Sequence, residues 1–351
     1  MRVKKVAAVT VACAIALAIT SCSTPKSDAI TEPDASAAAS ECGPLKEMTK
    51  VTLGVNPGAQ DLVTSAIKDQ GLDKKYNLDL DIKSFLNPPA SATAVTQRSV
   101  DIGFGGTTSM AVARSQGSDV FLFGALASPS NGVFVPKDSA IKNIGDLKGK
   151  RLGSFSANNS ATFAVLSAIA NESFGIPKLE DAVASLTVAP DAAVLGLMDQ
   201  GELDAVLTGS TATVVTELTG KYKKIGDLST EYIEATGTIP VHLALASTET
   251  YAADHCSELV AFSNAMRDGV AYVQGDDKAW DRYAQSLKLT DPKAPKALQA
   301  LLGENFRTAW DQKQVDGMVK LIESLIPILG AEDFVKESPK GLFSLDYVAA
   351  K

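Results

Sequence analysis

Short apolar segments with strand character alternate with helical segments along most of this chain, and this alternation restricts the fold more than any other feature. The segments 51–55, 78–85, 100–104 and 120–125 have the length and apolar content of buried strands. Helical patterns and loops rich in glycine, proline and small polar residues separate them. Strands that alternate with helices predict a mostly parallel α/β sheet.

The same rhythm starts a second time after a run of turn-forming residues at 126–132 and an extended segment at 133–135. Further strands are expected at 151–153, 186–188 and 203–207. A long apolar run at 239–246 leads into a C-terminal region that has helical spacing from Ala252 onward. A chain of 351 residues is long enough for two domains, so we expect two α/β units.

One loop, Ser154–Thr162, is rich in small hydroxyl and amide residues and precedes a helix expected at 163–170. The first turn of a helix has unpaired backbone N–H groups and a positive partial charge, so such a loop can hold a polar or anionic ligand. The simpler interpretation is an N-cap, in which Asn158, Asn159 or Ser160 satisfies the first turn.

The first 21 residues have the parts of a signal peptide. Met1–Lys5 is positively charged, and Val6–Ile19 is apolar but short for a membrane span. Leu17–Cys22 resembles the lipobox of bacterial lipoproteins, although Ser rather than Gly or Ala precedes the cysteine. We therefore expect cleavage before Cys22, lipid on its thiol, and anchoring at the outer face of the cell membrane. Secretion without lipid is the alternative.

The cysteines fit an exported protein. Cys13 falls within the signal peptide, and Cys22 would carry the lipid. Cys42 and Cys256 remain, in a compartment where disulfides persist, so we predict that they pair; two unconnected thiols are the alternative. Four cysteines without metal-ligand spacing, and only two histidines, argue against a zinc site.

The mature chain is acidic. Removal of residues 1–21 would leave 30 basic and 41 acidic residues, a net charge of −11. Binding to phosphate backbones needs clustered Lys and Arg, and the sequence has no basic block. Nucleic acid is therefore not expected as a partner.

Four motifs in order resemble the solute-binding proteins of ABC importers that handle nitrate, sulfonates, taurine and pyrimidine precursors (the NMT1/THI5-like and SsuA-like proteins). The glycine-rich segment Val100–Gly106 precedes a helix, and Gly117–Val120 precedes a strand. Ile144–Arg151 and Met198–Ala205 follow in the second half. The likeness covers about residues 50–330. The chain departs from many related proteins at Thr208–Thr211, where an aromatic residue is common.

This resemblance implies a periplasmic-binding-protein fold of type II, with two α/β lobes, two crossover strands and a ligand cleft. The implied lobes are a first lobe (46–130 and 245–351) and a second lobe (131–244). They follow the signal peptide (1–21) and a segment (22–45) whose Ser, Ala, Pro, Asp and Thr content without apolar periodicity predicts a disordered tether. The resemblance also implies a monomer without cofactor or metal. The protein would close by a hinge motion around a small organic solute and deliver it to a permease and ATPase.

Candidate ligand-binding residues lie where strands end and loops lead into helices. Glycines let the backbone approach a ligand, and hydroxyl and amide groups donate hydrogen bonds. The candidates are Asn56, Pro57, Gly58, Asn87, Gly105, Gly106, Thr107, Thr108, Ser128, Asn131, Ser154, Asn158, Asn159, Ser160, Thr162, Thr208, Gly209, Ser210 and His242. The alternatives are a tight turn for Gly105 and Gly106, an N-cap for Thr107, and a buried structural role for His242. His255 is expected at the surface.

The candidate loops contain no Arg or Lys except Lys137 and Arg151 at their edges. Strongly charged anions usually recruit an Arg fork, so a neutral or weakly charged ligand is favoured, or one anion held by backbone dipoles alone. An enzyme is the rival class, but the chain has no Gly-x-Ser-x-Gly motif and no evident nucleophile with a positioned base. An exported ligand sensor without a transporter is a further alternative.

Overall fold

The structure is a computed structural model, and it describes residues 42–56, 58–85, 88–157, 160–331 and 334–348. The predictions for the signal peptide, Cys22 and most of the tether lie outside the described residues, as do Pro57, Asn87, Asn158 and Asn159.

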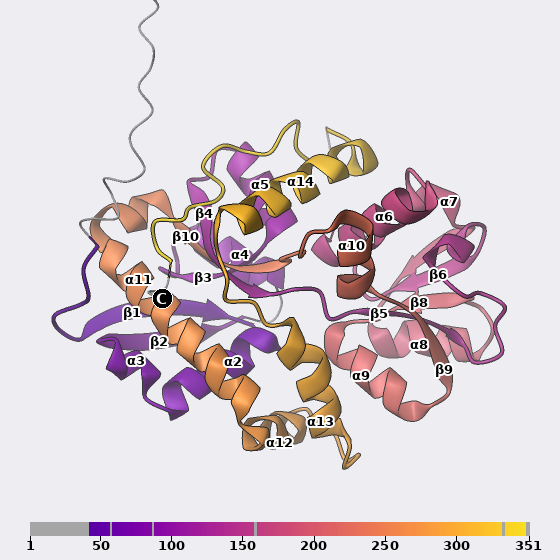
Figure 1. Cartoon of the computed structure of the whole chain (residues 1–351), viewed down its shortest axis with the longest axis horizontal. Helices are drawn as coiled ribbons and strands as arrows, with labels where there is room; N and C mark the ends of the chain where they lie inside the picture. Colours follow the sequence, from indigo (N-terminus) through magenta and orange to yellow (C-terminus); the bar gives the residue numbers. More distant parts are fainter. Residues whose placement is uncertain (1–41, 57, 86–87, 158–159, 332–333, 349–351) are drawn as a thin grey trace, which may run out of the picture. The chain divides into compact units, whose positions relative to one another are not determined.

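We call the part that carries the first two groups of strands the first lobe (Figure 1). Its strands are β1 (Thr49–Val55), β2 (Leu78–Ser84), β3 (Gly103–Gly106), β4 (Val120–Ala127) and β10 (Leu243–Thr248). β1 and β2 pair in parallel, and β10 lies between β3 and β4, antiparallel to both. A parallel bridge from Leu53 to Ile102 links the two groups.

The second lobe is built on one five-stranded sheet, in the order β7-β6-β8-β5-β9. Its strands are β5 (Gly132–Pro136), β6 (Arg151–Ser154), β7 (Ser185–Val188), β8 (Ala205–Leu207) and β9 (Tyr222–Asp227). β6 runs parallel to β7 and β8, whereas β5 runs antiparallel to β8 and β9.

The expectation of mostly parallel sheets needs a correction at β5 and β10. β3 and β4 share one direction because both are antiparallel to β10, and β8 and β9 share one direction because both are antiparallel to β5. Each inserted strand follows a crossover from the other lobe and runs against the direction of its neighbours. An apolar run indicates a buried strand but not its direction.

The helices of the first lobe flank these strands. They are α2 (Ala59–Asp69), α3 (Leu72–Lys75), α4 (Pro88–Thr96), α5 (Thr107–Ser115), α11 (Glu249–Gly275), α12 (Asp277–Ser286), α13 (Ala294–Leu298), the π-helical turn η2 (Gln299–Gly303) and α14 (Gln312–Leu329). The second lobe has the 3-10 turn η1 (Ile144–Leu147), α6 (Ala161–Phe174), α7 (Leu179–Ala182), α8 (Asp191–Asp199), α9 (Ser210–Thr219) and α10 (Leu228–Thr236). Within the described ranges, no helix combines the length and apolar content that crossing a membrane requires.

Strand β9 and helix α10 were not predicted from the sequence. The signals for α10 are present, since Asp227 caps its first turn by accepting a hydrogen bond from the Thr230 N–H and Gly237 ends it in a left-handed conformation (φ 69°).

Helix α14 packs against elements of both lobes, because it contacts α5 and α6. Its apolar residues, among them Met318, belong to a core that includes Phe163 of α6. The Met318 sulfur accepts a hydrogen bond of 3.3 Å from the backbone N–H of Val241, on the return crossover. The last long helix therefore stabilises the crossover as well as the first lobe.

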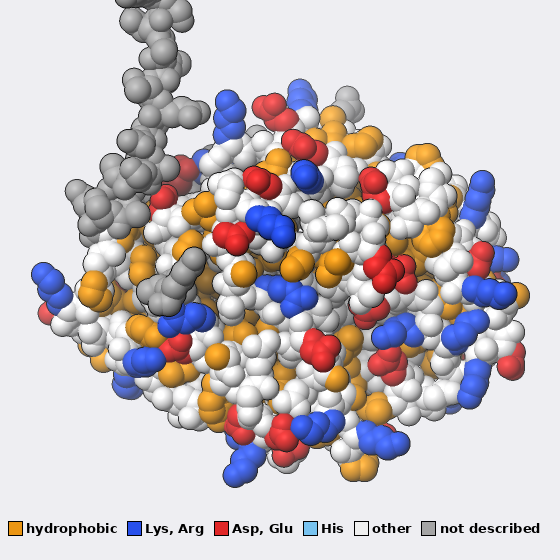
Figure 2. Space-filling view, viewed as in Figure 1, with side chains coloured by type: hydrophobic (Ala, Val, Ile, Leu, Met, Phe, Trp, Pro, Cys, Tyr) orange, Lys and Arg blue, Asp and Glu red, His pale blue; other side chains and the backbone are white. Residues whose placement is uncertain are grey.

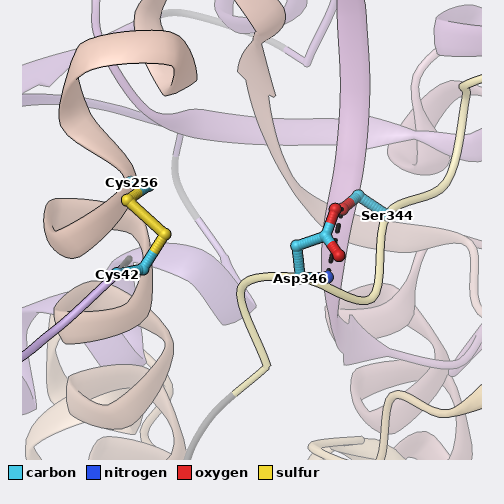
Figure 3. Close-up of a disulfide and its surroundings, with 4 residues drawn as sticks. All are labelled: Cys42, Cys256, Ser344 and Asp346. Atoms are coloured by element: carbon cyan, nitrogen blue, oxygen red, sulfur yellow. Dashed lines mark hydrogen bonds between the residues drawn. A yellow bond between two sulfur atoms is a disulfide. The ribbon is translucent and has the colours of Figure 1, made fainter. Parts of the chain in front are cut away.

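The predicted disulfide is present. Cys42 and Cys256 are joined, with Cα atoms 5.4 Å apart, so the first described residue is attached to α11 (Figure 3). At His255, just before the bridge, α11 departs from helical geometry (φ −131°, ψ 30°). The His255 ring is half-exposed, as expected, and stacks on Tyr251 with centroids 4.4 Å apart.

Candidate ligand-binding site

Residues of both lobes line one cavity of about 880 Å³. The first lobe contributes the starts of α2 and α5, and the second lobe contributes the starts of α6 and α9. The predicted residues that line the cavity are Asn56, Gly58, Gly106, Thr108, Ser128, Asn131, Ser160, Thr162, Ser210 and His242. The fold thus brings together side chains that are up to 186 positions apart in the sequence, from Asn56 to His242.

Two other predicted residues, Gly105 and Thr107, lie beside the cavity without lining it. A Cβ atom at position 105 would meet the Met110 side chain at 2.5 Å, so packing requires glycine there. Thr107 is the first residue of α5 and not its N-cap, which is Gly106. Its hydroxyl donates to the Val241 carbonyl at 2.8 Å.

Ser154, Thr208 and Gly209 also do not line the cavity. The Ser154 hydroxyl donates to the Ser156 carbonyl at 2.7 Å, and the Thr208 hydroxyl donates to the Gly132 carbonyl at 3.2 Å. The Gly209 N–H donates to Asp191 Oδ1 at 2.8 Å. Local hydrogen bonds therefore occupy the groups that were expected to face a ligand.

The starts of four helices border the cavity, and their first turns present backbone N–H groups. Helix α2 follows Gly58, which has φ 126° and ψ −144°, a conformation that favours glycine. Helix α6 follows Ser160, whose hydroxyl accepts from the Phe163 N–H at 3.2 Å. For Ser160 the N-cap interpretation is therefore correct, and the same residue also lines the cavity.

Two of these helix starts have an acidic side chain of the protein itself. Asp61 lies in the first turn of α2, and Asp191 Oδ1 accepts from the N–H of Gly209, the residue that caps α9. Burial raises the pKa of both carboxyl groups, although the bond from Gly209 opposes this for Asp191. These carboxyl groups already compensate part of the positive partial charge at the two helix ends.

No Asp, Glu, Lys or Arg occurs among the described residues that line the cavity. The ionisable lining residues there are His242 and Tyr283. Burial lowers the pKa of His242 to about 4, against the opposing effect of the Ala127 carbonyl, which lies 3.1 Å from Nδ1. Burial raises the pKa of Tyr283. Both side chains are therefore neutral at pH 7.

Two buried polar atoms at the first crossover have no hydrogen-bond partner among the described residues. They are Ser128 Oγ and Asn131 Oδ1. The Asn131 Nδ2 group donates to the Thr208 carbonyl at 2.9 Å, which fixes the orientation of the carboxamide. Buried polar groups are normally satisfied, so these atoms mark a place where a further partner is missing.

Part of the cavity wall consists of residues that were not predicted from the sequence. Gln60 lines the cavity, and its Oε1 accepts from the Asn56 N–H at 3.1 Å. The available signal was its place in the first turn of α2, two residues after the predicted Gly58. Phe104 and Phe155 are neighbours of predicted loop residues. No local pattern marks the distant apolar residues Tyr283, Leu302, Leu329 and Phe334.

Charge on the outer surface is mixed. On the face in Figure 2, Lys and Arg side chains are scattered among Asp and Glu side chains. Among the described residues, no cluster of three or more His, Cys, Asp or Glu side chains could hold a metal ion.

Two strand-and-helix lobes with two inserted crossover strands define the periplasmic-binding-protein fold, and solved structures with this fold are similar to the chain. The aliphatic sulphonate-binding protein SsuA of Escherichia coli matches with a TM-score of 0.66 and 17% identity, over 79% of this chain and 86% of that one. The alkanesulfonate-binding SsuA of Xanthomonas axonopodis pv. citri, bound to MOPS, matches with a TM-score of 0.63 and 15% identity, over 87% of this chain and 99% of that one. The Candida albicans protein CA3427 matches with a TM-score of 0.63 and 13% identity, over 86% of this chain and 98% of that one.

The chain belongs to the NMT1/THI5-like family, whose model matches residues 66–279. The recognition made from the sequence motifs is thereby confirmed. No curated protein matches the chain.

Proposed function

We propose that this protein is the extracytoplasmic solute-binding component of an ABC importer. It captures a small organic solute, such as a sulfonate, a carboxylate or a pyrimidine precursor, and delivers it to a permease and its ATPase. The observation that carries this proposal is the cavity of about 880 Å³, which both lobes line and four helix starts border. Its size lies within the range of small-molecule sites. Family membership and the names of the similar structures add support.

The proposed division of the chain is a first lobe of residues 46–130 and 245–351 and a second lobe of residues 131–244. The position of β5 in one sheet and β10 in the other supports these boundaries. The crossovers at 128–131 and 237–242 then form the hinge. The lining residues named above would contact the solute when the lobes close, and the protein would act as a monomer.

The proposed location is the outer face of the cell membrane, with lipid on the Cys22 thiol. The order of residues Leu17–Cys22 supports this. Replacement Cys22→Ala should move the protein from the membrane fraction to the soluble fraction, and an unchanged distribution would contradict the anchor.

We also propose that the protein has no enzymatic activity. Asp61 follows the lining residue Gln60, and Asp191 already holds the N–H of Gly209, next to the lining residue Ser210. His242 is directed to the Ala127 carbonyl through Nδ1. A general base needs a reacting group within reach, and the contacts of Asp191 and His242 serve the fold instead.

The test is identification of a bound solute. Native mass spectrometry of the purified protein should show a copurified small molecule, and a thermal-shift screen of sulfonates, carboxylates and pyrimidines should reveal stabilisation. Ligand at 100-fold above Kd adds about 2.7 kcal/mol to the free energy of unfolding. Absence of both signals would overturn the proposal. As a matched pair, Thr162→Val should weaken the stabilisation, whereas Thr219→Val, on the far end of α9, should not.

A further inference from the structure

The cavity is electrostatically unsuited to a negatively charged ligand. Its described wall has no basic side chain, and the carboxyl groups of Asp61 and Asp191 lie at two of the four helix starts. Asp61 follows the lining residue Gln60, and Asp191 holds the N–H of Gly209, next to the lining residue Ser210. An anionic ligand would therefore approach acidic groups without any Lys or Arg to offset them.

The lining residue Asn131 also carries an acceptor that lacks a donor. Asn131 Oδ1 is buried and has no partner among the described residues, while its Nδ2 group is held by the Thr208 carbonyl. A buried acceptor without a partner has lost its hydrogen bond to water and gained none in return, which costs free energy. An N–H or O–H group of a ligand would recover this energy. A sulfonate group or a nitrate ion has only acceptor oxygens, so neither can donate to Asn131 Oδ1.

The remaining wall is suited to an apolar body. Phe104, Val112, Phe155, Leu243 and Leu302 line the cavity, and its volume of about 880 Å³ far exceeds that of a small inorganic ion. Hydroxyl groups such as those of Thr108 and Ser210 can both donate and accept, which suits neutral heteroatoms.

We propose that the solute is an uncharged organic molecule with an apolar, ring-sized body and an N–H or O–H group that donates to Asn131 Oδ1. This inference rests on the proposed function and makes it more specific. It separates this chain from the similar structures whose names specify sulfonates.

The first experiment compares ligands that share one body and differ in charge. Benzamide, benzoate, benzenesulfonate and benzyltrimethylammonium, and the corresponding naphthalene compounds, are titrated into the purified protein by calorimetry. The amides should bind at least about 10-fold more tightly than either anion or the ammonium, a difference of about 1.4 kcal/mol. Their affinity should change less than about 2-fold between low and high salt, because no ionic attraction contributes.

Tighter binding of an anion or of the ammonium would overturn the inference but leave the proposed function intact. A charged copurified solute would do the same. If no compound binds and no solute copurifies, both proposals fail.

The second experiment tests Asn131 directly. The native protein should prefer benzamide to N,N-dimethylbenzamide, which lacks the N–H donor, by about 10-fold, and Asn131→Leu should abolish this preference. The measured quantity is a ratio within one variant, so a general loss of stability does not affect it. Ser324→Ala, on α14 and outside the cavity lining, is the control and should keep the preference. An equal preference in native protein and Asn131→Leu would overturn the role of Asn131.

Because Ser128 Oγ has no partner among the described residues, Ser128→Ala provides a milder variant. The unliganded protein should keep its Tm, while the amide affinity should fall. Lower stability without ligand and unchanged affinity would show that the hydroxyl serves the fold instead.

Discussion

The hydroxyl of Thr107 donates a buried hydrogen bond of 2.8 Å to the backbone carbonyl of Val241. Thr107 begins α5, directly after the lining residue Gly106, and Val241 lies on the return crossover. The Thr107 N–H also donates to the His242 carbonyl at 3.4 Å. One residue thus connects the cavity wall to the segment on which lobe closure would depend.

We predict that Thr107→Val lowers the free energy of unfolding by about 1–3 kcal/mol, because it leaves the buried Val241 carbonyl without its side-chain donor. Urea denaturation measures this change. Thr107→Ser keeps the hydroxyl and should retain more of the stability. Equal stability of the two variants would show that the hydrogen bond contributes little.

Gly58→Ala should destabilise the protein by about 1–3 kcal/mol and weaken ligand binding. The reason is backbone strain at φ 126°. A steric clash is not the cause, because a Cβ atom at this position would meet no atom within 4 Å. Displacement of the start of α2 would also alter the cavity wall. Thermal unfolding and a titration with the identified solute measure the two effects. Gly43→Ala, which also has open space and no left-handed backbone, should change neither; a similar loss at both positions would contradict the argument.

Loss of the Cys42–Cys256 disulfide should lower the free energy of unfolding by up to about 5 kcal/mol on the chain-entropy model, since the bridge closes a loop of 214 residues in sequence separation. Denaturation of native protein with and without a reductant measures this. The double variant Cys42→Ser/Cys256→Ser should resemble the reduced protein and should not respond to reductant. Labelling of both thiols in unreduced, unfolded protein would contradict the bridge.

Stability should fall as the pH is lowered from about 6.5 towards 4, in part because of His242. Burial holds the pKa of His242 at about 4 in the folded protein, whereas the unfolded side chain titrates near 6.5. Between these values the unfolded state binds the extra proton, so acidification favours unfolding. Above pH 6.5 both states are neutral and the effect vanishes.

Denaturation midpoints between pH 4 and 8 test this for His242→Asn, which should flatten the slope. His255→Asn, on the half-exposed histidine, is the matched control because the chain has two histidines. If His255→Asn flattened the slope and His242→Asn did not, the assignment would be wrong.

The pH response should change again at lower pH. Burial raises the pKa of Asp268, but hydrogen bonds from Lys75, Tyr76 and Arg267 outweigh it and bring the pKa to about 2. A depressed carboxyl pKa gives stability above the unfolded value near 3.9, and this stability is lost as the pH falls towards 2. Asp268→Asn should therefore lower stability at pH 7 more than at pH 2, and acid-unfolding curves measure the difference. An equal loss of stability at pH 7 and at pH 2 would rule out an electrostatic origin of the effect.

Much of the site was predictable because it depends on local order. Strand-end loops with glycine and hydroxyl residues predicted ten lining residues, among them Gly106, Thr162 and Ser210. Thr208 and Ser154 have the same chemistry, but their hydroxyls bond to nearby carbonyls, so composition alone could not separate them from residues on the wall. Tyr283 and Leu302 carry no local signal because only chain folding brings α12 and η2 to the cavity.

The sequence by itself determined most strands, most helices and the family, since periodicity, turn residues and motif order are local properties. It also determined the pairing of Cys42 with Cys256, because no other cysteine remains outside the signal peptide and the expected lipid site. Tertiary structure decided the direction of β5 and β10, the partners of Thr107 and Asp191, and the absence of charge on the described cavity wall. Those features depend on which backbone carbonyls and side chains meet across the lobes. Such contacts join residues far apart in the chain, and no local pattern specifies them.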